Sequence, residues 1–318
     1  MNRIFIGSST EGFEIADKIS NGIADIADIK LWKDVFELGK SNYENLASQI
    51  AFYDYAILIA TSDDVTISRK KKSDSARDNV LFEFGLFSGG LGRDKALYVM
   101  EEGIKIPSDL LGVSLPQIKK KNDPDFTKSI ENCISEIKNY IKSKEQTFNL
   151  GFLPSTALAY GYFKNFVERT VQRLLEDKVE KKKFKLENGT SFIIDDIKFT
   201  VLIPDDLSDD MFNKVKAKRL KSGWQKMKVD PKDVRDYDFS IDVSKAENGL
   251  LHLVDIPLTL NALNLSIELY TQKNHIGKNE KEMLLESREI RNFKRTLEYL
   301  VQKSSIAWDI VDIEIVDV

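Results

Sequence analysis

One glutamate in the first half of the chain lies in a mostly apolar segment, ARDNVLFEFG, which runs from Ala76 to Gly85. On a helix, the neighbours of Glu83 at three and four residues are Asn79 and three apolar side chains. We therefore expect the carboxylate to be partly desolvated, which makes its charge chemically potent and structurally costly. A buried ion pair with Arg77 or another basic residue would produce the same pattern, and the residues by themselves favour neither interpretation.

A second candidate for chemistry is the run from Gly7 to Thr10, which follows a short β-rich segment ending at Ile6. In an open parallel sheet, ligands bind beyond the carboxyl ends of the strands. Glycine lets a ligand approach the backbone there, and the hydroxyls of Ser8 and Ser9 can donate to a phosphate or a ribose. A plain strand-to-helix turn capped by Ser or Thr is the simpler interpretation of so short a pattern.

In the second half, the segment HLVDIPLTL predicts a strand that ends at Ile256 and a helix that begins at Pro257. Asp255 and Thr259 would then lie together near a helix N-terminus. A carboxylate in that place can accept two hydrogen bonds from the N1 and N2 donors of a guanine. Upstream, seven basic residues between Lys214 and Lys228 are typical of a solvated surface.

The first residues of the second half predict a helix that carries small and aromatic residues on one face. Ala157, Tyr160 or Gly161, and Lys164 can lie along one helical face. Such a face permits the close approach of another helix or of a flat ligand. Ordinary helix packing explains it slightly better when these residues are taken alone.

Alternating strand and helix patterns predict how the first-half groups are positioned. Continuous apolar runs are typical of strands covered on both faces, and segments with helical spacing separate them. We expect strands at 3–6, 29–32, 54–60 and 96–100, and helices at 13–26, 43–53, 78–87 and 126–141. This order predicts an α/β domain with a parallel sheet and helices on both sides.

A polar segment without periodicity, 142–146, marks the expected domain boundary. We place the first domain at 1–146 and the second at 150–318. In the second, a long helix over about 156–180 ends in three lysines, which suit a helix C-terminus. We expect strands at 191–194, 198–203, 239–243, 250–256 and 306–318, and helices at 258–270 and 281–303. Helices around a small mixed sheet make this half α+β.

Composition argues against several classes of function. The chain has 318 residues and a formal net charge of -4, so nothing global indicates binding to DNA or RNA. Its single cysteine, Cys133, cannot form a disulfide within the chain, which fits a reducing cytoplasm. We expect no signal peptide and no membrane span. Both histidines, His252 and His275, lie in the second half, and no metal cluster or GxxxxGK[ST] loop is visible, so we expect no metal and no ATPase.

The first half resembles a TIR domain, and more narrowly the prokaryotic TIR-like effectors of nucleotide-signalling defence systems. The order IFIGSST, LWKD, DYAILIATSDD and ARDNVLFEFG carries this resemblance. It implies a flavodoxin-like fold and cleavage of NAD+ at its nicotinamide–ribose bond, with NAD+ as substrate and no cofactor. Glu83 matches the helix glutamate that the family needs for this cleavage. The implied substrate contacts are Phe5, Gly7, Ser8, Ser9, Trp32, Arg77 and Asn79.

The chemistry is consistent with that family. Loss of nicotinamide leaves an oxocarbenium-like ribose, related to the transition state of glycoside hydrolysis. A carboxylate held near the ribose can accept hydrogen bonds from its hydroxyls and stabilise the developing positive charge. Because nicotinamide is a good neutral leaving group, the reaction does not strictly require a second acid.

The second half resembles the cyclic-dinucleotide-binding domain of STING in its bacterial form. The segments GYF, RDY and DIPLT carry the match. The resemblance implies a V-shaped homodimer with one ligand in the cleft, no membrane region, and a higher-order oligomer or filament on ligand binding. Tyr162 or Phe163 would stack on a base, Arg235 would contact the ligand from a lid hairpin, and Asp255 with Thr259 would read guanine, which favours cyclic di-GMP. The implied ligand contacts are Tyr162, Phe163, Arg235, Tyr237, Asp255, Pro257 and Thr259.

Together the two resemblances predict a TIR–STING fusion, an NAD+ hydrolase gated by its own sensor that arrests or kills an infected cell. A ligand that favours the assembled state shifts the population toward it, and the TIR-like domains then meet. One alternative is a non-enzymatic signalling adaptor whose TIR-like domain only recruits partners. Another is a nucleoside-processing enzyme similar to deoxyribosyltransferases, with an unrelated second domain. The residues do not distinguish hydrolysis from cyclisation of ADP-ribose.

Overall fold

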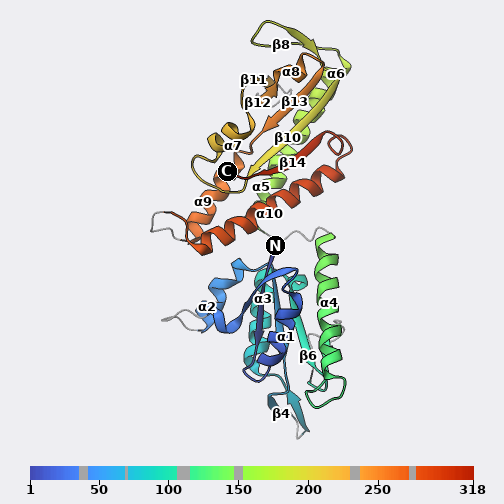
Figure 1. The fold of residues 1–318 in the computed structure, drawn as a ribbon, viewed down its shortest axis with the longest axis vertical. Helices are drawn as coiled ribbons and strands as arrows, with labels where there is room; N and C mark the ends of the chain where they lie inside the picture. The colour runs from blue at the N-terminus through green and yellow to red at the C-terminus, as the bar shows by residue number, and fades with distance from the viewer. Residues whose placement is uncertain (36–41, 69–70, 106–114, 147–152, 230–236, 272–276) are drawn as a thin grey trace. The chain divides into compact units, whose positions relative to one another are not determined.

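Parallel strands form the N-terminal sheet of the computed structural model (Figure 1). They are β1 (Asn2–Ser8), β2 (Ala27–Leu31), β3 (Tyr55–Ala60), β6 (Ala96–Glu101) and β7 (Gln117–Ile118). The helices between and after them are α1 (Phe13–Ile23), α2 (Asn42–Gln49), α3 (Asp78–Leu91) and α4 (Phe126–Gln146). The strand order β2-β1-β3-β6-β7 is the flavodoxin-like order of a doubly wound sheet, which confirms the predicted fold class.

The first strand shows how this sheet distributes its side chains. Ile4 and Ile6 belong to the core that includes residues of α1 and α4. Phe5 belongs to the opposite core, where its ring stacks on Phe87 of α3 with centroids 4.5 Å apart. Successive residues of a strand point to opposite faces, so Gly7 lies on the same face as Phe5. The strand thus brings Gly7 to the side of the sheet that α3 covers.

The C-terminal unit is built on a mixed sheet with the order β11-β12-β13-β10-β14. Its strands are β10 (Asp196–Pro204), β11 (Trp224–Val229), β12 (Tyr237–Asp242), β13 (Leu250–Asp255) and β14 (Val311–Val316), and β8 (Lys183–Lys185) pairs with β9 (Ser191–Ile193). Its helices are α5 (Pro154–Tyr162), α6 (Glu168–Val179), α7 (Met211–Arg219), α8 (Val243–Ala246), α9 (Thr259–Thr271) and α10 (Glu280–Lys303). The predicted α+β architecture is confirmed.

One helix of this unit departs from regular geometry. Between α5 and α6, residues Phe163–Val167 form a π-helical turn, so the predicted long helix is continuous but contains one wide turn. Such turns occur often at functional sites. This one lies between Tyr162 and Glu168, next to the aromatic residues considered below.

The structure describes residues 1–35, 42–68, 71–105, 115–146, 153–229, 237–271 and 277–318. They divide into two compact units, Met1–Asn149 and Leu150–Val318. Within the described residues, no helix is both long enough and apolar enough to cross a membrane.

Several elements differ from the sequence prediction. A hairpin of β4 (Asp64–Ser68) and β5 (Lys71–Ser75) precedes α3, and its charged sequence gave no strand signal. The lysine-rich stretch, for which the sequence gave no element, forms α7 and β11, and most of its basic side chains are exposed, as expected of a solvated surface. The C-terminal strand, expected at 306–318, is shorter, because β14 begins only at Val311.

Candidate functional site

Helix α3 brings Glu83 against the end of the first strand. Val80 and Phe87, three residues before and four after Glu83, are buried on the same side of the helix. A Cβ atom added at Gly7 would lie 3.0 Å from Glu83 Oε2 and 2.5 Å from the side chain of Leu58. Only a glycine leaves room for the carboxylate beside the backbone of β1. The two segments that the sequence marked separately therefore form one site.

The charge of Glu83 is not neutralised by the neighbour that the sequence suggested. Arg77 instead pairs with Glu11, with 2.7 Å between Nη2 and Oε1. Among the described residues, Glu83 has neither a hydrogen bond nor an ion pair. Burial raises the pKa of Glu83 to about 7. The ion-pair interpretation with Arg77 is thus wrong, and a desolvated carboxyl group lies at the carboxyl end of β1.

The hydroxyls after β1 are already used inside the protein. Trp32 Nε1 donates to Ser8 Oγ at 3.2 Å, and Ser8 Oγ donates to the carbonyl of Ser9 at 2.9 Å. Ser9 Oγ accepts from the amide of Gly12 at 3.0 Å, so Ser9 supports the turn, but the N-cap of α1 is Gly12 and not the Ser or Thr that the simpler interpretation predicted. Both serines are buried. They hold the loop beside Gly7 in place, while Trp32 joins the loop to the end of β2.

The remaining predicted substrate contacts have different environments. The ring of Phe5 is fully buried between Phe87 and Tyr53, so its side chain packs beneath the site and offers no surface to a ligand. Asn79 is exposed on the first turn of α3, four residues before Glu83, and Arg77 is partly exposed at the N-cap of that helix. Gly7, Ser8, Trp32 and Glu83 therefore lie together most closely.

Residues that the sequence prediction omitted hold the neighbouring loop after β3. Thr61 Oγ1 lies 3.1 Å from Ser9 Oγ and donates to Asp63 Oδ2 at 2.8 Å. The amide and hydroxyl of Ser62 both donate to Glu101 Oε2 at 2.7 Å. These groups follow β1, β3 and β6, whose carboxyl ends meet at one edge of the sheet, and that rule was the signal that could have identified them.

In the C-terminal unit, Tyr162 and Asp255 meet directly. Tyr162 Oη donates to Asp255 Oδ2 at 2.6 Å, which links α5 to the end of β13. Burial raises the pKa of Asp255 to about 6, although the hydrogen bond from Tyr162 acts in the opposite direction. Burial beside this carboxylate holds the pKa of Tyr162 well above its usual range. Among the described residues, Tyr162 is the side chain that donates a hydrogen bond to Asp255, so the carboxylate can accept further hydrogen bonds, as a recognition site requires.

Phe166 is a further aromatic residue beside Tyr162, and the sequence prediction omitted it. Phe163 is only 1% exposed and Tyr162 only 6%, so neither of the two predicted rings presents a free face. Phe166 is half-buried, stacks on Tyr162 with centroids 5.2 Å apart, and contacts Phe239 at 5.2 Å. It lies one helical turn after Tyr162, and that spacing was the signal that the sequence prediction did not use.

A cavity of about 400 Å³ reaches Asp255. Phe239 and Trp224 contribute aromatic surface to it, and Lys216 and Lys226 contribute positive charge. The buried hydroxyl of Thr259 has no hydrogen-bond partner among the described residues. Pro257, two residues before Thr259, is also buried. Arg235 and the side chain of Tyr237 lie outside the described residues.

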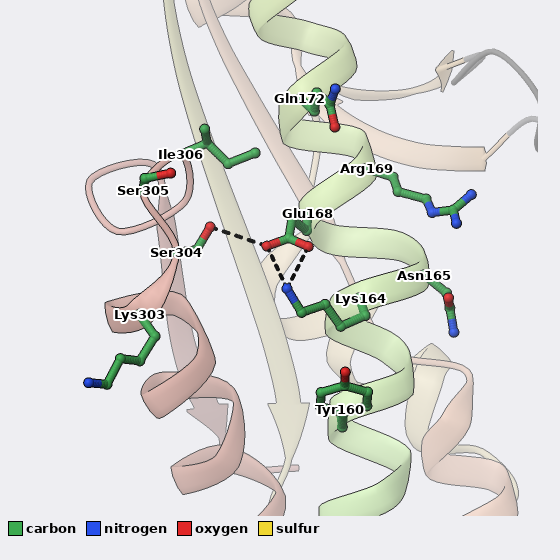
Figure 2. A pocket seen from close by; sticks show the side chains of 10 residues that line it. All are labelled: Tyr160, Lys164, Asn165, Glu168, Arg169, Gln172, Lys303, Ser304, Ser305 and Ile306. Carbon is green, nitrogen blue, oxygen red and sulfur yellow. Dashed lines mark hydrogen bonds and ion pairs between the residues drawn. The ribbon is translucent and has the colours of Figure 1, made fainter.

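A second cavity, of about 630 Å³, lies between the α5–α6 helix and the end of α10 (Figure 2). Lys164 pairs with Glu168 at 2.8 Å, and Ser304 donates to the same carboxylate at 3.5 Å. Figure 2 shows that Arg169 and Lys303 point away from one another. The polar contacts drawn in this cavity are made within the protein, because Lys164 and Ser304 both bond to Glu168. Within the described ranges, no three His, Cys, Asp or Glu side chains are grouped so as to hold a metal ion.

Comparisons with known proteins agree with this two-part architecture. Residues 3–120 match the family model of the TIR domain of CAP12/Pycsar effector proteins, and residues 154–298 match that of the prokaryotic STING domain. The Pycsar effector protein BcPycTIR of Burkholderia cepacia is 36% identical over 130 residues, which is 39% of this chain and 43% of that protein.

Two solved structures are also similar. A bacterial STING in complex with c-di-GMP is 32% identical and covers 53% of this chain and 99% of its own, with a TM-score of 0.45. A metazoan TIR-STING receptor from C. gigas in complex with 2',3'-cGAMP is 13% identical and covers 99% of this chain and 89% of its own, with a TM-score of 0.32.

Similarity over the whole length identifies the family. CD-NTase-associated protein 12 of Flavobacterium daejeonense is 36% identical over 312 residues, which is 98% of each chain. The protein of the same name from Lachnospiraceae bacterium (strain RUG226) is 33% identical over 316 residues, again 98% of each chain. With an N-terminal TIR domain and a C-terminal STING domain in the same order, this chain belongs to the CD-NTase-associated protein 12 family.

Proposed function

We propose that this chain is an NAD+ hydrolase that a cyclic dinucleotide activates. The observation that carries the proposal is the carboxylate of Glu83, which is desolvated, has no ion-pair partner among the described residues, and lies against Gly7. Such a group is costly to the fold and is expected where a charge is needed for chemistry. The reaction consumes NAD+ and water and releases nicotinamide, ADP-ribose and a proton.

The geometry supports a direct role for the ionised carboxylate. Heterolysis of the nicotinamide–ribose bond leaves positive charge on the ribose, and nicotinamide departs with the bonding electrons as a neutral molecule. The carboxylate of Glu83 would accept hydrogen bonds from the ribose hydroxyls and stabilise that charge. The glycine backbone beside it gives the ribose close access. Trp32 and Ser8, tied together by their hydrogen bond, would form the wall of the pocket.

The C-terminal unit is proposed to bind cyclic di-GMP. Asp255 offers carboxylate oxygens to the N1 and N2 donors of guanine, and Thr259 offers a hydroxyl that has no partner among the described residues. Phe166 offers a ring on which a base can stack. Lys216 and Lys226 line the cavity that reaches Asp255 and would contribute positive potential toward the phosphates.

A homodimer through the C-terminal unit is part of the proposal, and the surface of α9 supports it. Leu265 and Leu269 of α9 are 55% and 71% exposed and lie four residues apart on one side of the helix, and Leu258, which is 68% exposed, lies one residue before the helix begins. Exposed apolar rows of this kind mark protein interfaces. Leu258 also lines the cavity that reaches Asp255, so a second copy on this row would adjoin the ligand site. Binding would favour larger assemblies in which TIR domains meet.

The names of the relatives suggest the setting. The similar proteins are named CD-NTase-associated protein 12 and Pycsar effector protein. We propose the same setting for this chain: a cytoplasmic effector of CBASS-type anti-phage defence that depletes NAD+ in an infected cell. It needs no cofactor or metal for the chemistry described here.

The experiment measures ligand binding and NAD+ cleavage separately. Purified full-length protein is titrated with cyclic di-GMP by calorimetry, and free nicotinamide is measured with NAD+ at several protein concentrations. Binding together with ligand-dependent nicotinamide release supports the proposal. Binding without release at any concentration supports the adaptor interpretation, and absence of binding removes the sensor role.

A further inference from the structure

A buried carboxylate of α10 holds the first turn of α5. Glu289 is only 2% exposed, and its Oε2 accepts a hydrogen bond at 3.1 Å from the backbone amide of Ser155, which is fully buried. The two residues are 134 positions apart in the chain. A carboxylate at this depth is stable only where it is well bonded, so its position is specific.

The N-terminus of α5 depends on this contact. Leu153 at the N-cap provides no side-chain cap, and Pro154 at the first helical position has no amide to donate. Glu289 therefore caps the helix from another element, and its negative charge suits the positive end of the helix dipole. One turn later on α10, Asn292 Nδ2 donates to Ser155 Oγ at 2.9 Å and to Thr156 Oγ1 at 2.7 Å. We call Glu289 and Asn292 together the α10 clamp.

The first turn of α5, which the α10 clamp holds, lies in the chain between the connection to the TIR domain and Tyr162. Immediately before it, residues 147–152 connect the helix to α4 of the TIR domain. Two turns after it, the same helix carries Tyr162, which is bonded to Asp255. One rigid helix thus joins the proposed ligand site to the connection with the TIR domain. Farther along, the weaker bond between Ser304 and Glu168 again ties this helix to the end of α10 (Figure 2).

We infer that the α10 clamp couples ligand binding to TIR activity by fixing the end of α5 from which the connection starts. This inference rests on the proposed function. A ligand that shifts Tyr162 and Phe166 can act on the TIR domain only if the far end of the helix moves with the sensor core rather than fraying. Glu289 and Asn292 are therefore positioning residues, and neither contacts the ligand site.

Glu286 provides a matched control on the same helix. It is also buried, and its Oε1 accepts the amide of Leu207 at 2.6 Å while Lys278 pairs with its Oε2 at 2.7 Å. Glu289→Met and Glu286→Met each remove a buried carboxylate from neighbouring turns of α10, and Glu286→Met also removes an ion-pair partner of Lys278, so the control is expected to cost at least as much stability. They differ in what they release, because only the first frees the end of α5.

The experiment uses the full-length chain. Coupling is the ratio of nicotinamide release with and without cyclic di-GMP, and binding is measured by calorimetry on the same samples. We expect Glu289→Met to bind within about threefold of wild type and to lose at least tenfold in coupling, with Asn292→Ala intermediate. Glu289→Gln, which keeps an oxygen acceptor, is expected to restore most of the coupling. Glu286→Met is expected to keep coupling near that of wild type.

Hydrogen exchange of the Ser155–Tyr162 amides makes failure of this inference distinguishable from failure of the proposed function. The inference predicts that cyclic di-GMP slows their exchange in wild type and in Glu286→Met but not in Glu289→Met, whether or not nicotinamide is released. Equal coupling in Glu289→Met and wild type would overturn it, and so would equal losses in the two methionine variants. If cyclic di-GMP binds wild type by calorimetry but the exchange of these amides does not respond, the inference is wrong, whereas absence of binding means that the proposed sensor function is wrong.

Discussion

The carboxylate of Glu83 and the backbone of Gly7 occupy adjoining space, since a Cβ at position 7 would lie 3.0 Å from Glu83 Oε2. A residue of α3 and a residue of β1, 76 positions apart in the sequence, thereby define one site. The absence of a side chain on the strand is what permits a carboxylate, and in our proposal a ribose, to reach the backbone.

Gly7→Ala tests this relationship. The added methyl would lie 2.5 Å from Leu58 as well as against Glu83, in a buried region that cannot expand freely. We expect a loss of about 1–3 kcal/mol in the free energy of unfolding and at least tenfold lower NAD+ cleavage. Denaturant unfolding and nicotinamide release measure the two effects. Gly85→Ala, on the open side of α3, is the control and is expected to leave NAD+ cleavage unchanged and to raise the free energy of unfolding by about 0.5–1 kcal/mol, as for a glycine in a helix interior. Full activity in Gly7→Ala would contradict the proposed site.

Glu83 should make the fold sensitive to pH. Burial raises its pKa from 4.5 to about 7, so the folded state favours the protonated form. The stability that the folded state gains from protonated Glu83 is complete below pH 4.5 and is lost as pH rises through about 7. Glu83→Gln stays neutral and is expected to raise the free energy of unfolding by about 2 kcal/mol at alkaline pH and by little in acid. Urea unfolding across this pH range checks the sign, and destabilisation at alkaline pH would contradict it.

Activity should depend on pH in the opposite direction. The ionised carboxylate is the form that stabilises positive charge on the ribose, so kcat/KM for NAD+ is expected to rise with pH through an apparent pKa of about 7. A profile that falls over this interval would show that Glu83 acts in its protonated form. The measurement is made with saturating cyclic di-GMP, so that assembly does not limit the rate.

Arg77 pairs with Glu11 and is also a predicted contact of NAD+, and variants of the two residues can separate these roles. Exposed ion pairs contribute about 0–1 kcal/mol, so we expect Glu11→Gln to change stability little and activity not at all. If Arg77 contacts NAD+, Arg77→Gln raises KM several-fold with little change in kcat. Identical kinetics for the two variants would remove Arg77 from the substrate contacts.

Ligand binding should depend on the pair of Tyr162 and Asp255. Because the carboxylate is the acceptor for guanine, we expect cyclic di-GMP to bind more tightly as pH rises through about 6, the pKa of Asp255. The hydrogen bond from Tyr162 lowers that pKa, so Tyr162→Phe should move the transition to higher pH. Calorimetric titrations over this range measure the shift. Affinity independent of pH in wild type would show that Asp255 is not the acceptor.

Phe166 and Phe163 should behave differently despite their proximity. Loss of base stacking costs about 1–3 kcal/mol, so Phe166→Ala is expected to weaken cyclic di-GMP binding roughly tenfold or more. Phe163 lies in the core, and Phe163→Ala should instead lower stability by about 3–5 kcal/mol. Binding affinity and thermal unfolding of both variants test this division. Unchanged affinity in Phe166→Ala would show that the base does not stack on Phe166.

Local patterns were enough to predict the buried elements of the fold. β3 is an unbroken apolar run, and all its residues are buried between two layers of helices. β11 escaped prediction because it is an edge strand with exposed lysines, as edge strands often are. The hairpin of β4 and β5 was not predicted for a similar reason, because its two strands pair with each other outside the main sheet and their sequence is strongly polar.

The site itself was predictable in part. Helical spacing alone placed Glu83 on the buried side of α3, between Val80 and Phe87. It could not show that Arg77 would pair with Glu11, because that partner is 66 residues away and is fixed by tertiary structure. The capping of α5 by Glu289 was beyond prediction for the same reason.

The most direct test of the central claim compares nicotinamide release by wild type, Glu83→Gln and Glu11→Gln at equal concentration, each with and without cyclic di-GMP. Our account predicts release by wild type and Glu11→Gln that rises at least tenfold with the ligand, and none above background by Glu83→Gln. Calorimetry with cyclic di-GMP on the same samples should give equal affinities for all three. Wild-type release by Glu83→Gln would contradict the account.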